Sequence, residues 1–525
     1  MSASKQSRNL QSIFIAAVVS LGGFLFGFDA SVISGVIGFV TPQMDLNDIQ
    51  VGWLVSSPSV AAMFAMLIAG TISDYIGRKK VLIIAALLYS VSALFSAIAP
   101  TYEILIVARM IGGIGFGAAL VLAPMYIAEI APPEKRGVLV SIQQLNIVFG
   151  FSVSYFSNYG MLNAVGEVFT ELTVWRWMLG IEFFPAIFYF IAMFFVPRSP
   201  RWLLSTGREE EAEKVLLKVF GEEKSQEEKD KILRSLQETA ASRPKDLSNT
   251  DLLFKRLGEL FSPRLRVVLT IALIIGVIQQ VTGVNAIYFY APSIFEQSGV
   301  GRNAAFLQAV ILGLTNFFFT IVAMVTIDRF GRKPLLLIGL AGVILSMAIT
   351  AYSFGKATYS LSAEDGAALG LNQPQITAIY GQTFDSDVAF KKVFKESLGN
   401  VDYSRLEADI IQRSISVNSR LVLFGILLFV ASFAISLGPV MWVLLSEIFP
   451  NSNRGLAIAF IGFVNSLSST LVQFFFKWEL ANLGNAPTFM IFGAFGLIGF
   501  IALWKMLPET KGKSLEELEK ELLRE

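Results

Sequence analysis

The stretch that decides the fold is "GTISDYIGRKK" at residues 70–80, because it recurs as "MVTIDRFGRKP" at residues 324–334, 254 positions further along the chain. A second motif, "EIAPPEKRG" at 129–137, recurs as "EIFPNSNRG" at 447–455 with an offset of 318. The chain is therefore predicted to consist of two related halves. The 64-residue increase in the offset places an insertion between the two motifs of the second half.

Around these motifs the chain is strongly apolar. Hydrophobic residues make up 54% of the 525 residues, and charged residues make up only 16%. Soluble domains contain about 25% charged residues, so this composition is typical of a protein embedded in a lipid bilayer. A membrane-spanning helix needs about 20 consecutive, mostly apolar residues. Twelve segments meet this requirement, six on each side of a charged central region: 12–38, 52–73, 81–99, 103–128, 138–160, 176–197, 266–295, 304–327, 335–354, 418–446, 453–478 and 486–507.

The short loops between the predicted spans differ in charge. The loops after the second, fourth, eighth and tenth spans contain Lys or Arg, whereas those after the first and third contain neither. Basic loops stay in the cytoplasm, so we expect both termini to be cytoplasmic in a multi-pass protein of the cell (inner) membrane. The predicted organisation is a cytoplasmic N-terminus (1–11), an N-terminal six-helix bundle (12–197), a cytoplasmic helical linker (198–265), a C-terminal six-helix bundle (266–507) with an external insertion (355–417), and a cytoplasmic tail (508–525).

Composition also excludes several kinds of chemistry. The 42 Lys and Arg residues nearly balance the 41 Asp and Glu residues, which gives no reason to expect a nucleic-acid partner. The chain contains neither His nor Cys, so disulfides and imidazole or thiolate metal sites are excluded. We expect no metal, no cofactor and no catalytic constellation, hence no enzyme. Any proton that the chain carries must be held by a carboxylate.

Further motifs accompany the repeats in a characteristic order. They include "PMYIAEIAPPEKRG", "PRSPRWLL", "QQVTGVNAIYFYAP", "GPVMWVLLSEIFP" and "PETKG". In this combination the chain resembles the sugar-porter family of the major facilitator superfamily over nearly its whole length. The resemblance implies an all-α membrane protein with twelve transmembrane helices in two pseudo-symmetric six-helix bundles, the major facilitator fold, and a cytoplasmic helical linker. Arg198 departs from the family, which usually has Glu there, and the insertion is longer than the family norm.

Three ionisable residues, Asp29, Arg109 and Glu182, lie well inside predicted spans at a similar depth below the outer surface. Charges at such depth normally pair or line a water-filled cavity. One interpretation is a structural ion pair that fixes the first span against the fourth. The other is a proton switch, because burial favours the protonated acid and a nearby guanidinium favours the carboxylate. The resemblance favours the switch, since the family's proton symporters keep this Asp and this Arg, and Glu182 would tune the pair.

Amide and aromatic side chains inside the spans suit a neutral sugar, because they form hydrogen bonds without the desolvation cost of a charge. Any one of these amides could instead serve as a hydrogen bond between helices. Carried over position by position, the resemblance implies that Tyr290 is an outer gate, Trp442 an aromatic floor and Phe26 a packing surface for the ring. The implied sugar-binding residues are Phe26, Gln144, Gln279, Gln280, Asn285, Tyr290, Asn316, Trp442 and Asn465. Ser466 departs from the Trp that some members carry, which leaves the particular sugar open.

Charged residues of the repeated motifs fall at the predicted cytoplasmic ends of the spans. They could simply be solvated, but their duplication favours a network that closes the inner face while the cavity opens outward. The residues are Asp74, Arg78, Glu129, Arg136, Asp328, Arg332, Glu447 and Arg454.

We therefore expect a proton-coupled symporter that imports a small neutral monosaccharide, a hexose or pentose, by alternating access, and that works as a monomer in the bilayer. A passive uniporter, a sodium-coupled symporter and a non-transporting sugar sensor remain alternatives. Asp29 argues against the uniporter, and the short C-terminal tail argues against the sensor. The insertion has no assigned function; "DSDVAFKKVFKESLG" and "SRLEADIIQRS" predict short amphipathic helices within it, and its "DSD" at 385–387 indicates a helix start rather than a metal site.

Overall fold

The computed structural model describes residues 2–132, 135–241, 258–450, 453–511, 513 and 517–518. Within these residues, twelve helical segments are long and apolar enough to cross a membrane. The shortest has 21 residues, which at 1.5 Å per residue is about 31 Å, the thickness of a hydrocarbon core. The segments are Gln11–Gln43, Asp48–Ile76, Arg78–Ile98, Tyr102–Ile130, Gly137–Asn163, Val174–Phe195, Arg266–Phe289, Arg302–Ile327, Arg332–Gly355, Ser419–Ile448, Arg454–Asn482 and Asn485–Met506.

Several of these segments consist of more than one helix. The N-terminal half contains α1 (Ser2–Val19), α2 (Leu21–Gln43), α3 (Asp48–Ile76), α4 (Arg78–Ile98), α5 (Tyr102–Ile130), α6 (Arg136–Asn163), α7 (Val174–Gly180) and α8 (Phe183–Phe195). The central region contains α9 (Pro200–Ser205), α10 (Glu209–Phe220) and α11 (Glu222–Ala241). The C-terminal half contains α13 (Arg266–Val281), α14 (Val284–Phe289), α15 (Ala291–Glu296), α16 (Arg302–Phe330), α17 (Arg332–Gly355), α22 (Ser419–Ile435), α23 (Leu437–Ile448), α24 (Arg454–Asn482) and α25 (Asn485–Met506). The insertion contains β1 (Thr358–Tyr359), α18 (Ala363–Ala368), α19 (Pro374–Thr377), α20 (Asp387–Leu398), α21 (Asn400–Ser414) and β2 (Ile415–Ser416).

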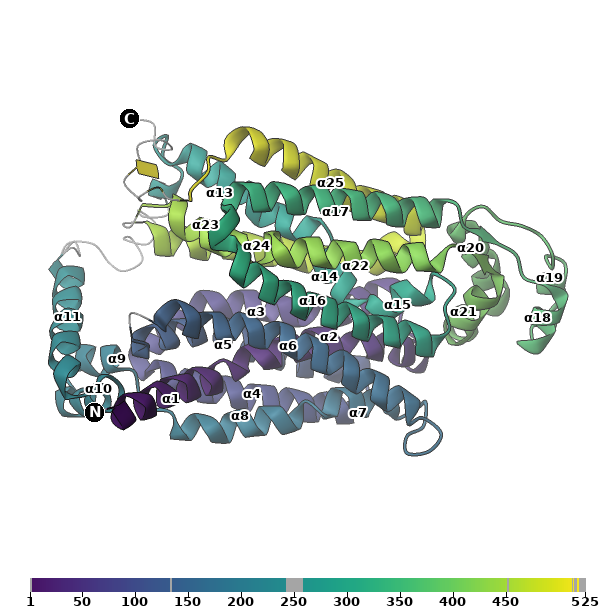
Figure 1. Ribbon diagram of the computed structural model, residues 1–525. Helices are drawn as coiled ribbons and strands as arrows, with labels where there is room; N and C mark the ends of the chain where they lie inside the picture. The colour runs from purple at the N-terminus through teal and green to yellow at the C-terminus, as the bar shows by residue number, and fades with distance from the viewer. Residues whose placement is uncertain are drawn as a thin grey trace.

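The two halves lie against each other as two groups of helices that run along a common direction (Figure 1). The start of α1, the end of α25 and helices α9–α11 lie at one end of the molecule, which we call the linker end. Helices α18–α21 lie at the opposite end, which we call the insertion end. The two ends of the membrane-spanning helices are thus marked by different accessory segments.

Close packing between helices depends on glycine. Gly27 of α2 faces the backbone carbonyl of Ile147, and Gly150 of α6 faces the backbone carbonyl of Phe24, so a methyl group at either glycine would collide with the neighbouring backbone. Two glycines of α5 approach α3 in the same way. Small residues allow this approach in a bilayer, where lipid tails provide little hydrophobic drive for helices to associate.

Four spans are broken, the first of them at Ser20 between α1 and α2, which the continuous apolar runs of the sequence do not predict. Glu182 lies at the break between α7 and α8, Gly283 at the break between α13 and α14, and Ser436 at the break between α22 and α23. Gly283 has a φ of 92°, a left-handed conformation that glycine adopts without a steric penalty. Broken helices place polar groups near the middle of a membrane, where the substrate sites of transporters lie.

The insertion folds around a small core of its own, in which Phe390 and Phe394 are buried. Strands β1 and β2 pair in an antiparallel manner, and α20 and α21 form where the sequence predicts amphipathic helices. Ser386 caps α20 by accepting a hydrogen bond from the backbone N–H of Ala389 at 3.3 Å. The "DSD" stretch is therefore a helix start, as expected.

Candidate functional site

A buried ion pair joins α2 to α5. Arg109 donates from Nη1 to Asp29 Oδ1 at 3.1 Å, and from Nε to the backbone carbonyl of Leu54 in α3 at 3.3 Å. The side chains of Arg109 and Asp29 are only 2% and 8% exposed. Because a single buried charge is costly, removing either member of such a pair leaves the other uncompensated.

Glu182 lies beside this pair, at the break between α7 and α8. Its side chain is buried and interacts electrostatically with both Asp29 and Arg109. Two acids and one guanidinium therefore lie in the same buried region, and the described ion pair joins Arg109 to Asp29. The three residues that sequence depth places in one layer lie together in the structure.

Four amide side chains form a connected hydrogen-bond network, which we call the amide cluster: Gln279, Gln280, Asn285 and Asn465. Asn465 donates to Gln279 Oε1 at 2.8 Å, and Gln280 donates to Asn465 Oδ1 at 3.1 Å. Asn285 donates to Gln280 Oε1 at 2.9 Å. The cluster lies at the break after α13 and extends to the break before α23, where Gln279 Nε2 donates to the carbonyl of Leu437 at 2.9 Å.

This cluster can exchange partners without creating a charge. Each amide has donors and an acceptor, and a hydroxyl group can replace either kind of partner. In the present state the amides satisfy one another, so a polyhydroxylated ligand would substitute for bonds that already exist rather than fill unpaired groups. A small number of convergent polar groups of this kind is the usual means by which a pocket fixes a small ligand's orientation.

The other predicted sugar-binding side chains make no hydrogen bond to the amide cluster. Gln144 is exposed on α6, and Asn316 is buried on α16. Trp442 of α23 is 45% exposed. Phe26 packs on Phe116 within the N-terminal half, with ring centroids 5.0 Å apart. The predicted set is therefore divided between the halves, with the hydrogen-bonded part confined to the C-terminal one.

Sequence reasoning missed Gln473 of α24 and its two serine partners, Ser59 and Ser469. Gln473 donates to Ser469 Oγ at 2.7 Å and accepts from Ser59 Oγ at 3.0 Å. The predicted gate residue Tyr290 is fully buried and donates to the backbone carbonyl of Gln473 at 3.1 Å. The signal that could have revealed Gln473 is the one used for the other amides, a polar amide inside an apolar span.

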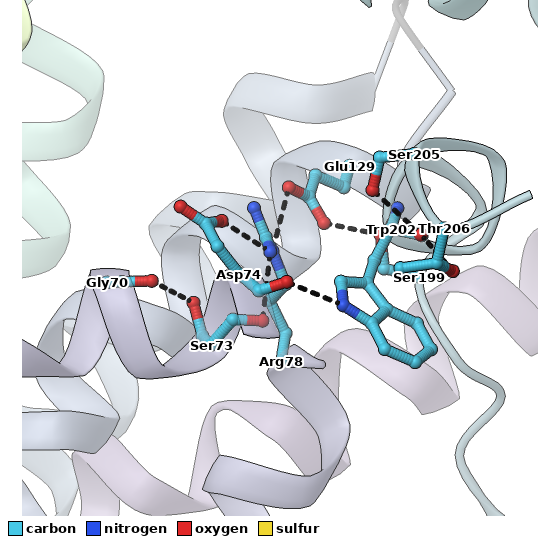
Figure 2. Close-up of polar contacts among 9 residues, drawn as sticks. All are labelled: Gly70, Ser73, Asp74, Arg78, Glu129, Ser199, Trp202, Ser205 and Thr206. Atoms are coloured by element: carbon cyan, nitrogen blue, oxygen red, sulfur yellow. Dashed lines mark hydrogen bonds and ion pairs between the residues drawn. The ribbon is translucent and has the colours of Figure 1, made fainter. Parts of the chain in front are cut away.

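At the linker end of the N-terminal half, Arg78 lies between two acids (Figure 2). Its guanidinium is 2.7 Å from Asp74 and 3.2 Å from Glu129. Glu129 also accepts a hydrogen bond from the hydroxyl of Ser199, and Trp202 donates from Nε1 to the backbone carbonyl of Asp74 at 3.0 Å. Helix α9, the first helix after the N-terminal half, is thus anchored to the predicted gate residues.

The C-terminal half repeats this arrangement. Arg332 contacts Glu447 through Nη2 at 2.8 Å and through Nε at 3.0 Å, and Thr510 donates to the same carboxylate at 2.6 Å. Arg454 donates from Nε to the backbone carbonyl of Phe449 at 3.2 Å. The side chains of the other two predicted members, Arg136 and Asp328, lie outside the described ones. Among the described side chains at the linker end, every ion pair that involves a membrane-spanning helix lies within one half.

The insertion end differs, because there the two halves touch directly. Gly52 of α3 faces the backbone carbonyl of Phe474 in α24. The ring of Trp53 meets the ring of Phe474 edge-on, with centroids 6.3 Å apart. Lys395 of the insertion lies 3.7 Å from Asp48 at the start of α3. The molecule is therefore closed between the halves at the insertion end.

Charged side chains line a small cavity at this closed end: Glu296, Arg302, Glu407 and Lys477. Burial raises the pKa of Glu296 to about 7, although Arg302, 3.7 Å away, and Lys477 oppose the shift. Burial would also raise the pKa of Glu407, but Lys477 and Lys391 hold it below its ordinary value. One acid that titrates near neutral pH thus lies within the contact.

Comparison with known proteins gives a consistent set of relatives. The family model described as "Sugar (and other) transporter" matches residues 15–372 and 403–522. The arabinose-proton symporter of Bacillus subtilis (strain 168) is 34% identical over 513 residues, covering 97% of this chain and 94% of the relative. The D-xylose-proton symporter of Escherichia coli (strain K12) is 33% identical over 538 residues, covering 96% and 94%. The galactose-proton symporter of the same strain is 31% identical, covering 99% and 97%.

Solved structures agree. An inward-open conformation of the xylose transporter XylE from E. coli superposes with a TM-score of 0.72 at 31% identity, covering 97% of this chain and 100% of that chain. The proton:xylose symporter XylE bound to 6-bromo-6-deoxy-D-glucose gives a TM-score of 0.68 at 32% identity, covering 98% and 100%. The predicted fold class, twelve transmembrane helices in two bundles, is confirmed.

Proposed function

The chain belongs to the sugar transporter family of the major facilitator superfamily, and from this premise we propose that it is a proton-coupled symporter that imports a small neutral sugar. The relatives named above are symporters of arabinose, xylose and galactose with protons, so the proposed substrate class is a pentose or hexose. The observation that carries the proposal is the buried Arg109–Asp29 ion pair at 3.1 Å. A passive transporter of neutral sugars moves no proton, so it has no need of a buried acid paired with a guanidinium.

We assign proton coupling to Asp29, Arg109 and Glu182. The group has one more acid than base, so taking up one proton makes it neutral, and losing that proton restores its charge. A rearrangement that brings Arg109 closer to Asp29 favours release, and one that withdraws Arg109 favours uptake. One proton crossing 100 mV supplies about 2.3 kcal/mol. At about 1.4 kcal/mol per tenfold ratio, this drives about a forty-fold sugar gradient.

We assign sugar binding to the amide cluster, together with side chains from both halves that are not bonded to it. Gln144, Phe26, Asn316 and Trp442 would complete the site, with Tyr290 as a gate on the insertion side. The exposure of Gln144 and Trp442 supports this role, because both remain available to a ligand. The hydroxyls of the sugar would take over hydrogen bonds from the amides, and an aromatic face would cover its C–H surface.

We further propose that the linker end is cytoplasmic, which makes the present state closed to the outside. In the opposite state the eight charged gate residues would close the inner face across the halves, braced by the helices of the 198–265 region. The proposed membrane units are the two six-helix bundles, 12–197 and 266–507. The 355–417 insertion of the second bundle would lie outside the cell, and the two ends of the chain, 1–11 and 508–525, would lie inside. We propose that one such chain is the working unit.

The test is uptake of radiolabelled xylose, arabinose and galactose into proteoliposomes, with a proton gradient and a sodium gradient imposed separately. The expected result is accumulation of at least one sugar above its external concentration only under the proton gradient. Asp29→Asn should abolish accumulation and retain exchange of internal for external sugar. Glu103→Gln, a neutralised acid exposed at the start of α5, is the matched control and should behave as the wild type.

Other outcomes identify the alternatives. Accumulation driven by sodium alone would indicate a sodium-coupled symporter. Equilibration without accumulation under either gradient would indicate a passive uniporter. Saturable binding of a sugar without any uptake would indicate a sensor. Accumulation by Asp29→Asn equal to that of the wild type would contradict the assignment of Asp29.

A further inference from the structure

A continuous path of side-chain hydrogen bonds leads from the amide cluster to the other half of the molecule. Asn285 donates from Nδ2 to Ser469 Oγ at 2.5 Å, and Gln473 donates from Nε2 to the same oxygen at 2.7 Å. Gln473 Oε1 in turn accepts from Ser59 Oγ in α3 at 3.0 Å. Gln473 is thus the last residue of the C-terminal half on a path that ends in the N-terminal half.

This crossing point differs from the other contacts between the halves. The other described hydrogen bonds between their membrane-spanning helices end on a backbone carbonyl or on a Met sulfur, as in Ser152 to Gly313 and Ser466 to Met66. Gln473 is only 1% exposed, so both ends of its amide are held away from bulk water. Leaving one end of an amide unpaired in that position is destabilising. Its position is therefore defined by both partners at once.

Gln473 also lies at the contact that closes the insertion end. The next residue, Phe474, presents its backbone carbonyl to Gly52 and its ring to Trp53. When α3 and α24 separate at this end, Ser59 must leave Gln473. The hydrogen bond between Ser59 and Gln473 thus exists only while the contact is closed.

We propose that Gln473 is a positioning residue that transmits occupancy of the amide cluster to closure of the contact between α3 and α24. Ser469 accepts hydrogen bonds from two donors, Asn285 and Gln473. A sugar hydroxyl that engages Asn285 leaves Gln473 as the remaining donor to Ser469. That bond then fixes the Gln473 amide with its oxygen toward Ser59, which favours closure. This inference rests on the proposed function for the identity of the ligand, while the hydrogen-bond path is independent of it.

The alternative is that Gln473 only holds two helices together, as buried amides in membranes often do. The two roles differ in what sugar does. A residue that only holds the helices together stabilises the closed contact by the same factor with and without sugar. A residue that transmits sugar binding is needed for the shift toward the closed state that sugar causes.

The absence of cysteine from the chain makes this distinction measurable. Glu103→Cys and Leu483→Cys place one spin label on each half at the insertion end, at two exposed positions. Double electron–electron resonance then gives the ratio of closed to open populations, without sugar and with D-xylose, L-arabinose or D-galactose. The variants are Ser59→Ala and Gln473→Leu. Ser468→Ala is the matched control, because its hydroxyl bonds only to Val464 in its own helix, at 2.9 Å.

Without sugar, Ser59→Ala and Gln473→Leu should each lower the closed-to-open ratio about five-fold, the equivalent of one neutral hydrogen bond of about 1 kcal/mol, and Ser468→Ala should leave it unchanged. Sugar should raise the closed-to-open ratio of the wild type. In both variants, the sugar-induced change in the logarithm of that ratio should be at most half of the change in the wild type. Variants that respond to sugar as the wild type does would overturn the proposal, as would an unchanged ratio without sugar. A wild type that none of the three sugars shifts would also overturn it, while the uptake assay scores the proposed function separately.

Discussion

Replacing Asp29 with Asn should destabilise the folded protein, apart from its effect on transport. The Asp29–Arg109 pair is 8% and 2% exposed, and the guanidinium of Arg109 stays protonated at any pH that the protein tolerates. The variant therefore keeps a buried cation whose direct counter-charge is gone. The remaining bond from Arg109 to the carbonyl of Leu54, at 3.3 Å, solvates this charge but does not neutralise it.

Removing one member of a buried ion pair costs about 3–5 kcal/mol. Glu182 interacts with the same guanidinium and can serve as a partial substitute, so we expect the loss for Asp29→Asn to fall near the lower value. Adding Glu182→Gln removes that substitute and should bring the loss toward about 5 kcal/mol. Adding Arg109→Met to Asp29→Asn instead removes the unpaired guanidinium. The double variant should therefore lose less free energy of unfolding than the sum of the losses of the two single variants.

The assay is a double-mutant cycle on the purified protein in detergent at pH 7, with unfolding followed by denaturant titration. The expected interaction energy between Asp29 and Arg109 is about 2 kcal/mol or more, well above the roughly 0.5 kcal/mol within which independent sites add. Glu103→Gln serves as the control for loss of an acid that has no buried partner. Additivity of Asp29→Asn and Arg109→Met within that limit would refute the account of the pair.

Three further outcomes follow from contacts described above. Gly27→Ala should reduce the yield and melting temperature of the folded protein, because its methyl group meets the carbonyl of Ile147; Gly160→Ala, with open space around the added carbon, is the control. Burial raises the pKa of Glu296 to about 7, so ionisation of this acid should open the insertion end as pH rises. The closed state is fully favoured below about pH 4.5 and loses stability as pH rises through 7. The total loss of its free energy relative to the open state should be at most about 3 kcal/mol. Spin-label distances at Glu103→Cys and Leu483→Cys measure this titration, and Glu296→Gln should flatten it. The charges that act on the carboxyl are Arg302, at 3.7 Å, and Lys477, Glu407 and Asp409. Arg332→Gln should increase the open population at the linker end, read from labels at Val138→Cys and Phe330→Cys; an unchanged distance distribution would contradict the gate assignment.

The sequence predicts the spans and the buried ion pair because both follow from one-dimensional rules. Hydropathy fixes which segments can enter a bilayer, and the helical rise of 1.5 Å per residue converts sequence position into depth. Asp29, Arg109 and Glu182 fall in one layer by that count alone. Contact between Asp29 and Arg109 follows because opposite charges at bilayer depth are stabilised by pairing. The pairing of Arg78 with Glu129, and of Arg332 with Glu447, was accessible through the repeat.

The breaks in the spans and the role of Gln473 could not be predicted in this way. Hydropathy is an average over about 20 residues, so a local change at Gly283 or Ser436 does not register in it. Gln473 gains its importance from Ser59, which is 414 positions away in sequence. Arg198, which departs from the family pattern, pairs with Glu211 of α10 at 3.1 Å, a partner that lies on a helix outside the membrane-spanning segments.

The contrast between the two ends explains how a modest driving force could move this molecule between states. At the linker end Arg78 and Arg332 each pair with an acid of their own half, so neither guanidinium is unpaired in the present state. At the insertion end closure depends on a glycine-mediated backbone contact, one neutral side-chain hydrogen bond and the Lys395–Asp48 ion pair, whose side chains are 45% and 25% exposed and return to water when the end opens. The free-energy difference between the states can therefore remain within a few kcal/mol, and a ligand shifts such an equilibrium by its differential affinity for the two states. One proton and one sugar, each favouring the same state by about 2–3 kcal/mol, would together supply the roughly 5.5 kcal/mol that reverses a hundred-to-one population.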